Sequence, residues 1–447
     1  MGKVSSDIQS LVIKKSDFPA NFTWGVATSS FQIEGAGQQD GRGTSIWDTF
    51  CETPAHIADQ SNGLVACDHY NRLDEDLDLI ASLGVKAYRF SISWPRVQPL
   101  GQGAWNEAGF DFYERLVDGL RQRGIEAFLT LYHWDLPQAL QDQGGWNNRD
   151  ICQHFCNYAC EVVRRLGDRV ATVCTHNEPW VVSILGHETG IFAPGLKDRK
   201  IAYQVGHHLL LSHGMALQAI RAMGYHKPLG IVLNQSPIYP ASQAPEDVAK
   251  ARLDDGIVVR WYMDPLLKGA YPADVIEWLG DDAPVVHAGD MAQIAQPLDF
   301  IGVNYYTRNF SCASQTWDVA STGNPLTEMG WEIYAPGLTE LLTRLHADYT
   351  LPAIYITENG GAFKDPMVNG QVDDQDRLAY LHDHIQATHM AMAQGVDVRG
   401  YFVWSLMDNF EWASGYEKRF GIVHVDYASL RRTLKQSALW YQSLLKG

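Results

Sequence analysis

Residues Glu126–Asp135 read EAFLTLYHWD, an apolar and aromatic run that stops at a histidine, a tryptophan and an aspartate. The length and composition of Glu126–Tyr132 are typical of a β-strand. Amphipathic patterns of helical length flank this run, Phe110–Arg123 before it and Asp150–Leu166 after it. A strand between two helices predicts a β/α repeat in which helices cover a sheet.

The same unit recurs along the chain. Further strand-like runs are Phe22–Ala27, Val85–Ser91, Val170–Thr175, Leu229–Asn234, Phe300–Tyr305, Ala353–Thr357 and Gly400–Ser405, and further helical patterns are Asp74–Leu83, Ala202–Met223 and Asp374–Gln394. Eight strands that alternate with helices predict a parallel sheet closed into a barrel. Such barrels can exceed about 400 residues, so one barrel accommodates all 447 residues. We therefore expect an α/β fold, a single (β/α)₈ TIM barrel over residues 1–447 with long loops after the strands and a short flexible N-terminal segment at residues 1–16.

Composition and charge limit which kinds of molecule we expect the protein to bind. The formal net charge is −17, and the acidic residues are spread along the chain. Nucleic acids and anionic membranes need a basic surface, so neither is an expected partner. The N-terminus has no continuous apolar core of signal-peptide length, and no stretch reaches the roughly 18 apolar residues of a membrane span. We expect a cytoplasmic protein.

Cysteine usage predicts no disulfide framework and no metal site. The chain has seven cysteines, an odd number for its size. Cys152, Cys156 and Cys160 would share one helix face with His154 nearby, which is compatible with a metal site. Cysteine is among the most often buried residue types, so packing in the core is the favoured interpretation.

The ends of the predicted strands carry polar and aromatic side chains. In a barrel of this kind, the carboxyl ends of the strands form the active-site face. Packing does not explain why such clusters follow six different strands, and we therefore expect a functional site there. The clusters are Arg89, His133-Trp134-Asp135, Asn177-Glu178-Pro179-Trp180, Asn304-Tyr305-Tyr306, Glu358-Asn359-Gly360 and Trp404.

The residue types at this face suit a sugar ligand. The chain has 14 tryptophans, whose flat apolar surfaces can stack on the C–H face of a pyranose. Amide, imidazole and carboxyl groups can bind its hydroxyls. Glu178 and Glu358 end predicted strands, and two carboxyl groups can run glycoside hydrolysis, one as proton donor and one at the anomeric carbon.

Taken together, the motifs resemble glycoside hydrolase family 1, the β-glucosidases and their relatives. The resemblance runs from Phe18 to about Trp440. Its motifs are Phe22–Thr28, Gln32–Gly35, Tyr88–Arg96, Tyr132–Pro137, Thr175–Pro179, Asn304–Thr307, Ile356–Gly360 and Trp404–Trp412.

The resemblance implies a role for each matching position. Glu178 would be the acid/base and Glu358 the nucleophile of a retaining mechanism with a covalent glycosyl-enzyme intermediate. Arg89, Asn304 and Tyr306 would hold the nucleophile ionised. The sugar-binding positions would be Gln32, His133, Trp134, Asn177, Trp404, Glu411, Trp412 and Phe420, and the side facing the leaving group would include Trp180, His187 and Trp331. The family needs no cofactor and no metal, and its substrates would be β-glucosides, including cello-oligosaccharides, with β-fucosides and β-galactosides as further substrates.

Three alternatives stay open on the sequence. A non-hydrolytic sugar-binding or thioglucosidase-like member would have lost Glu178, which is present here. A transglycosidase would use the same intermediate, and the sequence does not separate the two reactions. A 6-phospho-β-glycosidase would resemble Ser-x₆-Lys-x-Tyr after the last strand, where this chain has Glu411, Lys418 and Phe420. A glutamate would repel a phosphate dianion, so an unphosphorylated sugar is favoured. The number of subunits is undetermined from the sequence.

Overall fold

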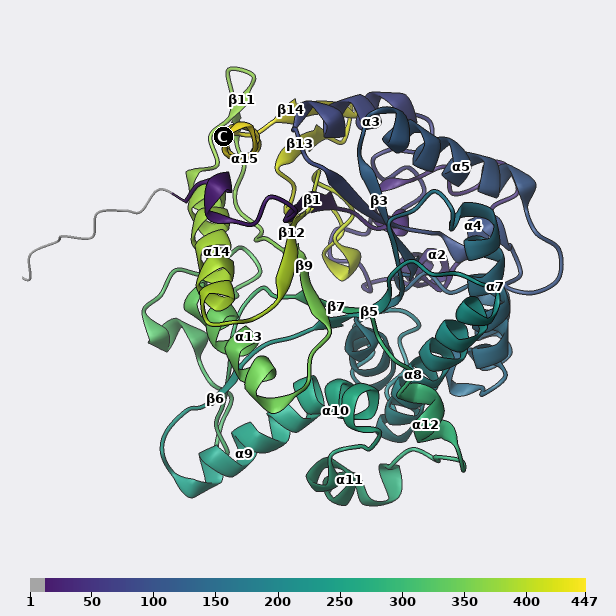
Figure 1. The fold of residues 1–447 in the computed structure, drawn as a ribbon, viewed down its shortest axis with the longest axis vertical. Helices are drawn as coiled ribbons and strands as arrows, with labels where there is room; N and C mark the ends of the chain where they lie inside the picture. Colours follow the sequence, from purple (N-terminus) through teal and green to yellow (C-terminus); the bar gives the residue numbers. More distant parts are fainter. Residues whose placement is uncertain (1–12) are drawn as a thin grey trace, which may run out of the picture.

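Eight strands close into a parallel barrel in the computed structural model, which describes residues 13–447. The strands follow one another round the barrel in chain order, and β12 returns to β1 through pairs such as Ala27 with Trp404 (Figure 1). Their bounds are Thr23–Ala27 (β1), Ala87–Ser91 (β2), Glu126–Tyr132 (β3), Thr172–Asn177 (β4), Leu229–Asn234 (β5), Phe300–Asn304 (β7), Ala353–Asn359 (β9) and Val398–Trp404 (β12). The predicted α/β barrel is confirmed, and no predicted strand bound is wrong by more than two residues.

Of the predicted N-terminal segment at residues 1–16, residues 1–12 lie outside the described part of the chain. The 3₁₀ turn η1 (Lys15–Asp17) follows, and the Lys15 ammonium donates to the Leu445 carbonyl at 2.9 Å. That carbonyl belongs to the last helix, α15 (Gln436–Lys446), so the start of the described chain lies against its end.

Helices form the outer layer around the barrel (Figure 1). The helix α5 (Glu107–Gln122) shows why these segments are helical, because Phe110, Tyr113 and Val117 recur three and four residues apart and are all buried. The other long helices are α3 (Leu73–Ser82), α7 (Ile151–Leu166), α8 (Arg199–Ala222), α13 (Pro336–Asp348) and α14 (Gln375–Ala393). Shorter helices are α1 (Ser30–Ile33), α2 (Ile46–Glu52), α4 (Trp94–Val97) and α6 (Gln138–Gln141).

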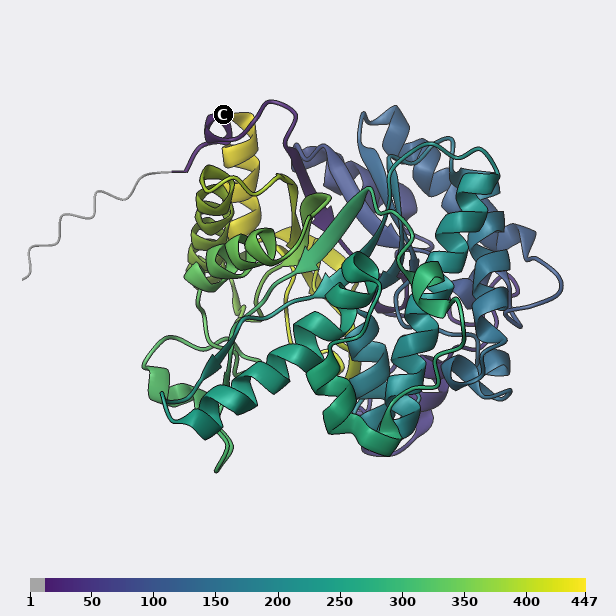
Figure 2. The same ribbon diagram turned by 60° about the horizontal axis from the view of Figure 1, so that its bottom comes forward.

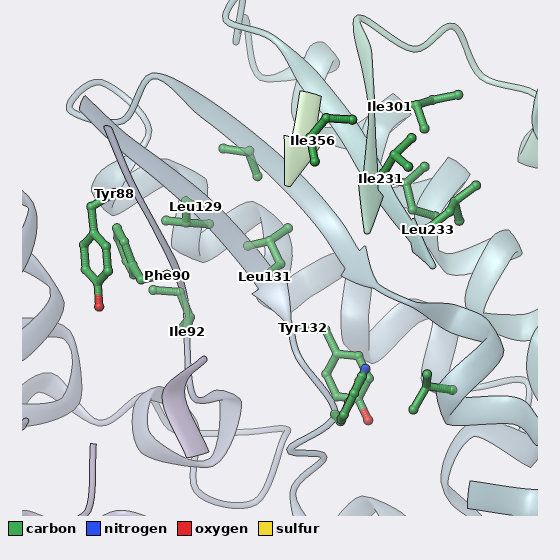
Figure 3. Close-up of a cluster of buried hydrophobic side chains, with 14 of the residues drawn as sticks. Tyr88, Phe90, Ile92, Leu129, Leu131, Tyr132, Ile231, Leu233, Ile301 and Ile356 are labelled. Atoms are coloured by element: carbon green, nitrogen blue, oxygen red, sulfur yellow. The ribbon is translucent and has the colours of Figure 1, made fainter. Parts of the chain in front are cut away.

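The strands are buried on both faces, as expected for a parallel sheet covered by helices. Alternate residues such as Tyr88 and Phe90 of β2 belong to the large cluster that includes helix side chains (Figure 3). Arg89 lies between them in sequence and points into the barrel, where it contacts groups on β4 and β9. The rings of Phe128 and Phe402 lie 4.9 Å apart in a separate inner cluster. The barrel interior is therefore packed.

The connections after β5, β7, β9 and β12 hold elements that the sequence analysis did not predict. After β5 come β6 (Ile238–Pro240), α9 (Pro245–Asp255), a π-helical turn η4 (Gly256–Arg260), α10 (Trp261–Lys268), α11 (Ala273–Leu279) and α12 (Asp290–Ile294). Figure 2 shows the first of these helices, in teal to green, on the side of the barrel that is turned forward. The strand β6 pairs with β8 (Asn309–Ser311) from the next connection, β10 (Met367–Val368) pairs with β11 (Gln371–Val372), and β13 (Val423–Asp426) pairs with β14 (Arg431–Leu434).

Candidate active site

A cavity of about 710 Å³ opens among residues that follow the carboxyl ends of the barrel strands. Most of the predicted site residues line it: His133, Trp134, Glu178, Trp180, Asn304, Tyr306, Trp331, Glu358, Trp404, Glu411, Trp412 and Phe420. Gln32, Arg89 and Asn177 are buried behind the wall, and each is hydrogen-bonded to a residue that forms it. The structure therefore brings nearly the whole predicted set together.

Glu358, on β9, is surrounded by donors. Arg89 donates from Nη1 to Glu358 Oε1 at 2.6 Å, and the Tyr306 hydroxyl donates to Oε2 at 2.5 Å. Burial raises the pKa of Glu358, and the charge of Arg89 and the Tyr306 hydrogen bond oppose that rise. Each carboxylate oxygen thus has a donor, and one of the donors is a cation.

Glu178 directly follows β4 and has weaker support. Its φ angle of 50° lies in the left-handed region, and its N–H donates to the Val232 carbonyl at 2.9 Å. The side chain accepts one bond, from Asn304 Nδ2 to Oε1 at 2.6 Å. Burial and then the charge of Glu358 raise the pKa of Glu178 to about 8. Of Glu178 and Glu358, Glu178 is therefore the one that holds a proton more readily, because it lacks a cationic partner.

Asn177 connects the groups around the two glutamates. Its Oδ1 accepts from Arg89 Nη2 at 2.6 Å and from Asn304 Nδ2 at 3.1 Å. Its Nδ2 lies 3.2 Å from His133 Nε2. Burial, with the nearby charge of Arg89, holds the pKa of His133 well below its ordinary value. The imidazole is therefore neutral, and its Nε2 can accept a hydrogen bond from Asn177 Nδ2.

A second polar group lies at Gln32, on the short helix α1 after β1, and at Glu411, in the connection after β12. Gln32 Nε2 donates to the Phe410 carbonyl at 2.9 Å and to Glu411 Oε2 at 3.4 Å. Ser29 donates to the Gln32 carbonyl oxygen at 2.6 Å, which fixes the orientation of the amide. Loss of water and the charge of Glu358 raise the pKa of Glu411 to about 8. This end of the cavity thus presents an oriented amide and a carboxyl group.

Aromatic rings form the walls between these polar groups. The Trp134 and Trp412 rings lie 4.5 Å apart, and the His133 ring is nearly parallel to that of Trp404 at 5.9 Å. Phe420 and Trp331 are 6.1 Å apart further along the wall. Flat apolar walls with a few fixed polar groups suit a ring-shaped polyol.

His187 does not line the cavity, unlike Trp180 and Trp331, although all three were predicted to face the leaving group. It belongs to the π-helical segment η3 (Val181–Glu188), is 1% exposed, and places its Nδ1 2.8 Å from the Val182 carbonyl. The wide turn brings residues five apart together, so the His187 imidazole is engaged inside its own segment.

Several cavity residues were missed by the sequence analysis. Asn234 at the end of β5 and Gln235 directly after it line the cavity, as do Asp254 of α9, Phe310 of β8 and Met329. Asn234 is the last residue of a correctly predicted strand and Gln235 follows it, so the signal of polar residues at strand ends could have found them. Phe310 and Met329 reach the cavity through irregular connections, for which the sequence has no comparable signal.

The three cysteines that were predicted to share one helix face lie on α7. Cys152 and Cys156 are buried on α7 and Cys160 is half-buried, consistent with packing. Among residues 13–447, no three His, Cys, Asp or Glu side chains are grouped to hold a metal ion. No helix in this part of the chain combines the length and hydropathy needed to cross a bilayer.

Comparisons with known proteins show the family of the chain. The sequence profile of the family described as Glycosyl hydrolase family 1 matches residues 14–447. Beta-glucosidase A of Acetivibrio thermocellus is 47% identical over 97% of this chain and 99% of its own, and a beta-glucosidase of Agrobacterium sp. is 48% identical over 96% and 95%. The solved family 1 β-glucosidase of Thermotoga maritima superposes with a TM-score of 0.93 at 45% identity, covering 98% of this chain and 99% of that one.

Proposed function

The chain belongs to glycosyl hydrolase family 1 and is a glycoside hydrolase, and we propose that it is a retaining β-glucosidase that removes terminal non-reducing β-D-glucosyl residues. We also propose that residues 1–447 form one catalytic domain. The β-glucosidases to which it is similar over nearly their whole length support this activity.

The mechanism rests on one observation: two buried carboxyl groups have different hydrogen-bond donors. Glu358 accepts from a guanidinium and a phenol, whereas Glu178 accepts from a neutral amide and has a pKa raised to about 8 by burial and by Glu358. An ionised Glu358 can attack the anomeric carbon while a protonated Glu178 protonates the departing oxygen. Glu178 then acts as the base that activates water against the glycosyl-enzyme.

The glycone is a neutral sugar on this proposal. Gln32 and Glu411 would bind the hydroxyls at the far end of the ring, Asn177 and His133 would bind hydroxyls nearer the bond that is cleaved, and Trp404 would stack on the ring. A 6-phosphate would meet the Glu411 carboxyl group and the Phe420 ring, which offers no donor. β-D-Fucosides and β-D-galactosides would be further substrates, because they keep most of these hydroxyls.

The leaving-group side would include Trp180 and Trp331, and the cavity is also lined by apolar residues such as Phe310 and Met329. We infer that it accepts both aryl groups and the next sugar of a cello-oligosaccharide, which would give the enzyme a role in cellulose degradation. All seven cysteines are free, which supports a cytoplasmic location. The acidic net charge disfavours nucleic acid and anionic membranes as partners.

A panel of p-nitrophenyl β-glycosides, followed by cellobiose and longer cello-oligosaccharides, tests the proposal. We expect the highest kcat/KM for the glucoside or fucoside and release of glucose from cellobiose. Product analysis by chromatography separates hydrolysis from transfer to a second sugar. A protein that preferred the 6-phosphoglucoside, or that bound these sugars without cleaving them, would contradict the proposal.

A further inference from the structure

Six charged side chains form a buried cluster between the barrel and the C-terminal elements. Its cations are Lys435, Arg377 and Arg419, and its carboxylates are Asp365, Asp374 and Asp408. The side chains are at most 1% exposed except that of Arg419, at 23%. None of the six lines the cavity. Three positive and three negative charges balance, so the cluster is neutral as a whole.

Asp408 connects the cluster to the loop that carries Glu411. It lies three residues before Glu411, and its Oδ1 accepts from Lys435 Nζ at 2.7 Å and from the Gly421 N–H at 3.1 Å. Its Oδ2 accepts from Arg419 at 2.6 Å. Gly421 follows Phe420, so one carboxylate holds both the chain that leads to Glu411 and the chain that leads away from Phe420.

Lys435 joins this loop to the chain that follows Glu358. Its ammonium donates to Asp365 Oδ2 at 2.5 Å as well as to Asp408, and Asp365 lies in the connection after β9. Arg377 holds Asp365 from the other side, with Nη1 and Nη2 at 2.9 Å and 2.7 Å from its two oxygens. A single buried cation thus links the connections after β9 and β12, which carry the two ends of the sugar site.

Burial of such a cluster needs an explanation other than stability. The free energy lost when charged groups leave water offsets much of the free energy gained from their mutual attraction. Apolar residues of similar volume often stabilise a fold at least as well. Fully paired buried charges do define one geometry, because any shift leaves a charge unpaired in a medium of low polarity. The cluster therefore suits a part of the fold whose position must be fixed.

We propose that Lys435 is a positioning residue for sugar recognition: by bridging Asp365 and Asp408 it sets the position of Glu411 and Phe420 relative to Glu358. The inference rests on the proposed function, in which Glu411 binds the hydroxyls at the far end of the glucose ring. Lys435 itself touches no substrate, and its effect is on the discrimination between sugars.

The test compares p-nitrophenyl β-D-glucoside with p-nitrophenyl β-D-xyloside, which lacks the hydroxymethyl group. In Lys435→Met, the ratio of kcat/KM for glucoside over xyloside should fall up to about tenfold, the effect of losing one hydrogen bond. This ratio does not depend on the fraction of folded enzyme, so a general loss of stability leaves it unchanged. In a Glu411→Ser background, the same substitution should change the ratio little.

Two further variants test the same ratio: a second substitution in the cluster and a control outside it. Arg419→Met removes the partly exposed donor to Asp408 and should lower the ratio in the same direction but less, which gives an answer even if Lys435→Met fails to fold. Arg149→Met is the matched control, because it removes the cation from Asp290, a carboxylate that is 4% exposed and lies outside the cavity wall. This control should lower the melting temperature and leave the ratio unchanged.

The possible failures are distinguishable. If the unmodified protein cleaves neither substrate, the proposed function is wrong. If it prefers the glucoside but Lys435→Met and Arg419→Met lower both rates equally, the function stands and the positioning role of Lys435 is wrong. An unmodified enzyme without preference for the glucoside would also overturn the inference, because Glu411 would then not recognise the hydroxymethyl group.

Discussion

At the scale of single residues, the environments of Glu178 and Glu358 set the pH dependence. Activity needs Glu358 ionised and Glu178 protonated, so kcat/KM should fall in acid as Glu358 takes up a proton. It should fall again above a pH of about 8, where Glu178 loses its proton. The measurement is kcat/KM for a nitrophenyl glucoside against pH, in the unmodified enzyme and in Glu178→Gln. An alkaline decline that persisted in Glu178→Gln would assign that titration to another group.

The acid role of Glu178 has a second consequence. Glu178→Gln keeps the hydrogen-bonding shape but cannot donate a proton to the departing oxygen. Cellobiose, whose leaving group is a poor one, should be cleaved roughly 10²- to 10⁴-fold more slowly, the usual contribution of a general acid. Formation of the glycosyl-enzyme from 2,4-dinitrophenyl glucoside, measured as a burst of dinitrophenol, should change far less. Equal losses on both substrates would contradict the assignment.

Glu411 tests how the far end of the sugar is recognised. Glu411→Ser removes a carboxyl group that borders the cavity and is held by Gln32. A hydrogen bond contributes about 0.5–1.5 kcal/mol, so kcat/KM for the neutral glucoside should fall roughly twofold to tenfold. The 6-phosphoglucoside should gain relative to it, because a carboxyl group that repels the phosphate whenever it is ionised has gone, while Phe420 still offers the phosphate no donor. If the unmodified enzyme preferred the 6-phosphate, this account of the subsite would be wrong.

At the scale of secondary-structure elements, the sequence predicted the barrel because its signals are local. A run such as Leu229–Asn234 is apolar over the length of a strand, and its structural bounds are the predicted ones. Polar residues at strand ends were found for the same reason, and they include Asn177, Glu178 and Glu358, whereas Arg89 lies in the middle of β2. The strand-end signal was present at Gln235 too but was not used.

The elements that were missed depend on contacts between distant segments. The strands β6 and β8 are three residues each and exist only as a pair, so neither has a pattern of its own. The π-helical turn that encloses His187 differs from an α-helix in its hydrogen bonds, which an apolar pattern does not specify. The cluster around Lys435 joins side chains as far apart as Asp365 and Lys435, and only the fold brings them together.

The contact between β9 and β12 supports a prediction at this scale. A Cβ atom on Gly360 would lie 1.7 Å from the Trp404 carbonyl oxygen, so Gly360→Ala must push apart the strands that carry Glu358 and Trp404. Such overpacking usually costs about 1–3 kcal/mol. We expect a lower melting temperature and a lower kcat. Gly206→Ala on α8 is the control, because its nearest atoms would be 3.5 Å away and alanine favours a helix. A Gly360→Ala enzyme as stable and active as the control would contradict this prediction, because it would show that the backbone at Trp404 can move without loss of stability.

At the scale of the whole molecule, buried neutral histidines link stability to pH. His176 and His213 are 0% exposed, and each has a ring nitrogen without a partner in the described chain. Burial holds the pKa of His176 well below its ordinary value and lowers that of His213 to about 3. The unfolded chain binds these protons below a pH of about 6.5 and the folded protein does not, so unfolding becomes more favourable as the pH falls. The stability they contribute is full above that pH and is lost towards a pH of about 3.

The resulting prediction is a fall in stability as the pH drops from about 6.5 to 4, by up to about 1.4 kcal/mol per pH unit for each such histidine. Chemical unfolding followed by tryptophan fluorescence at a series of pH values measures it. In His176→Phe, the dependence of the unfolding free energy on pH should decrease by the contribution of one proton. A phenyl ring can replace the imidazole that stacks on Phe155 at 4.4 Å, although the contact with Ser212 is lost. His226→Phe, at an exposed position, should leave the slope unchanged. His176→Phe could instead lower the free energy of unfolding by the same amount at every pH. That result would show that His176 contributes through packing and hydrogen bonding and is not a source of acid sensitivity.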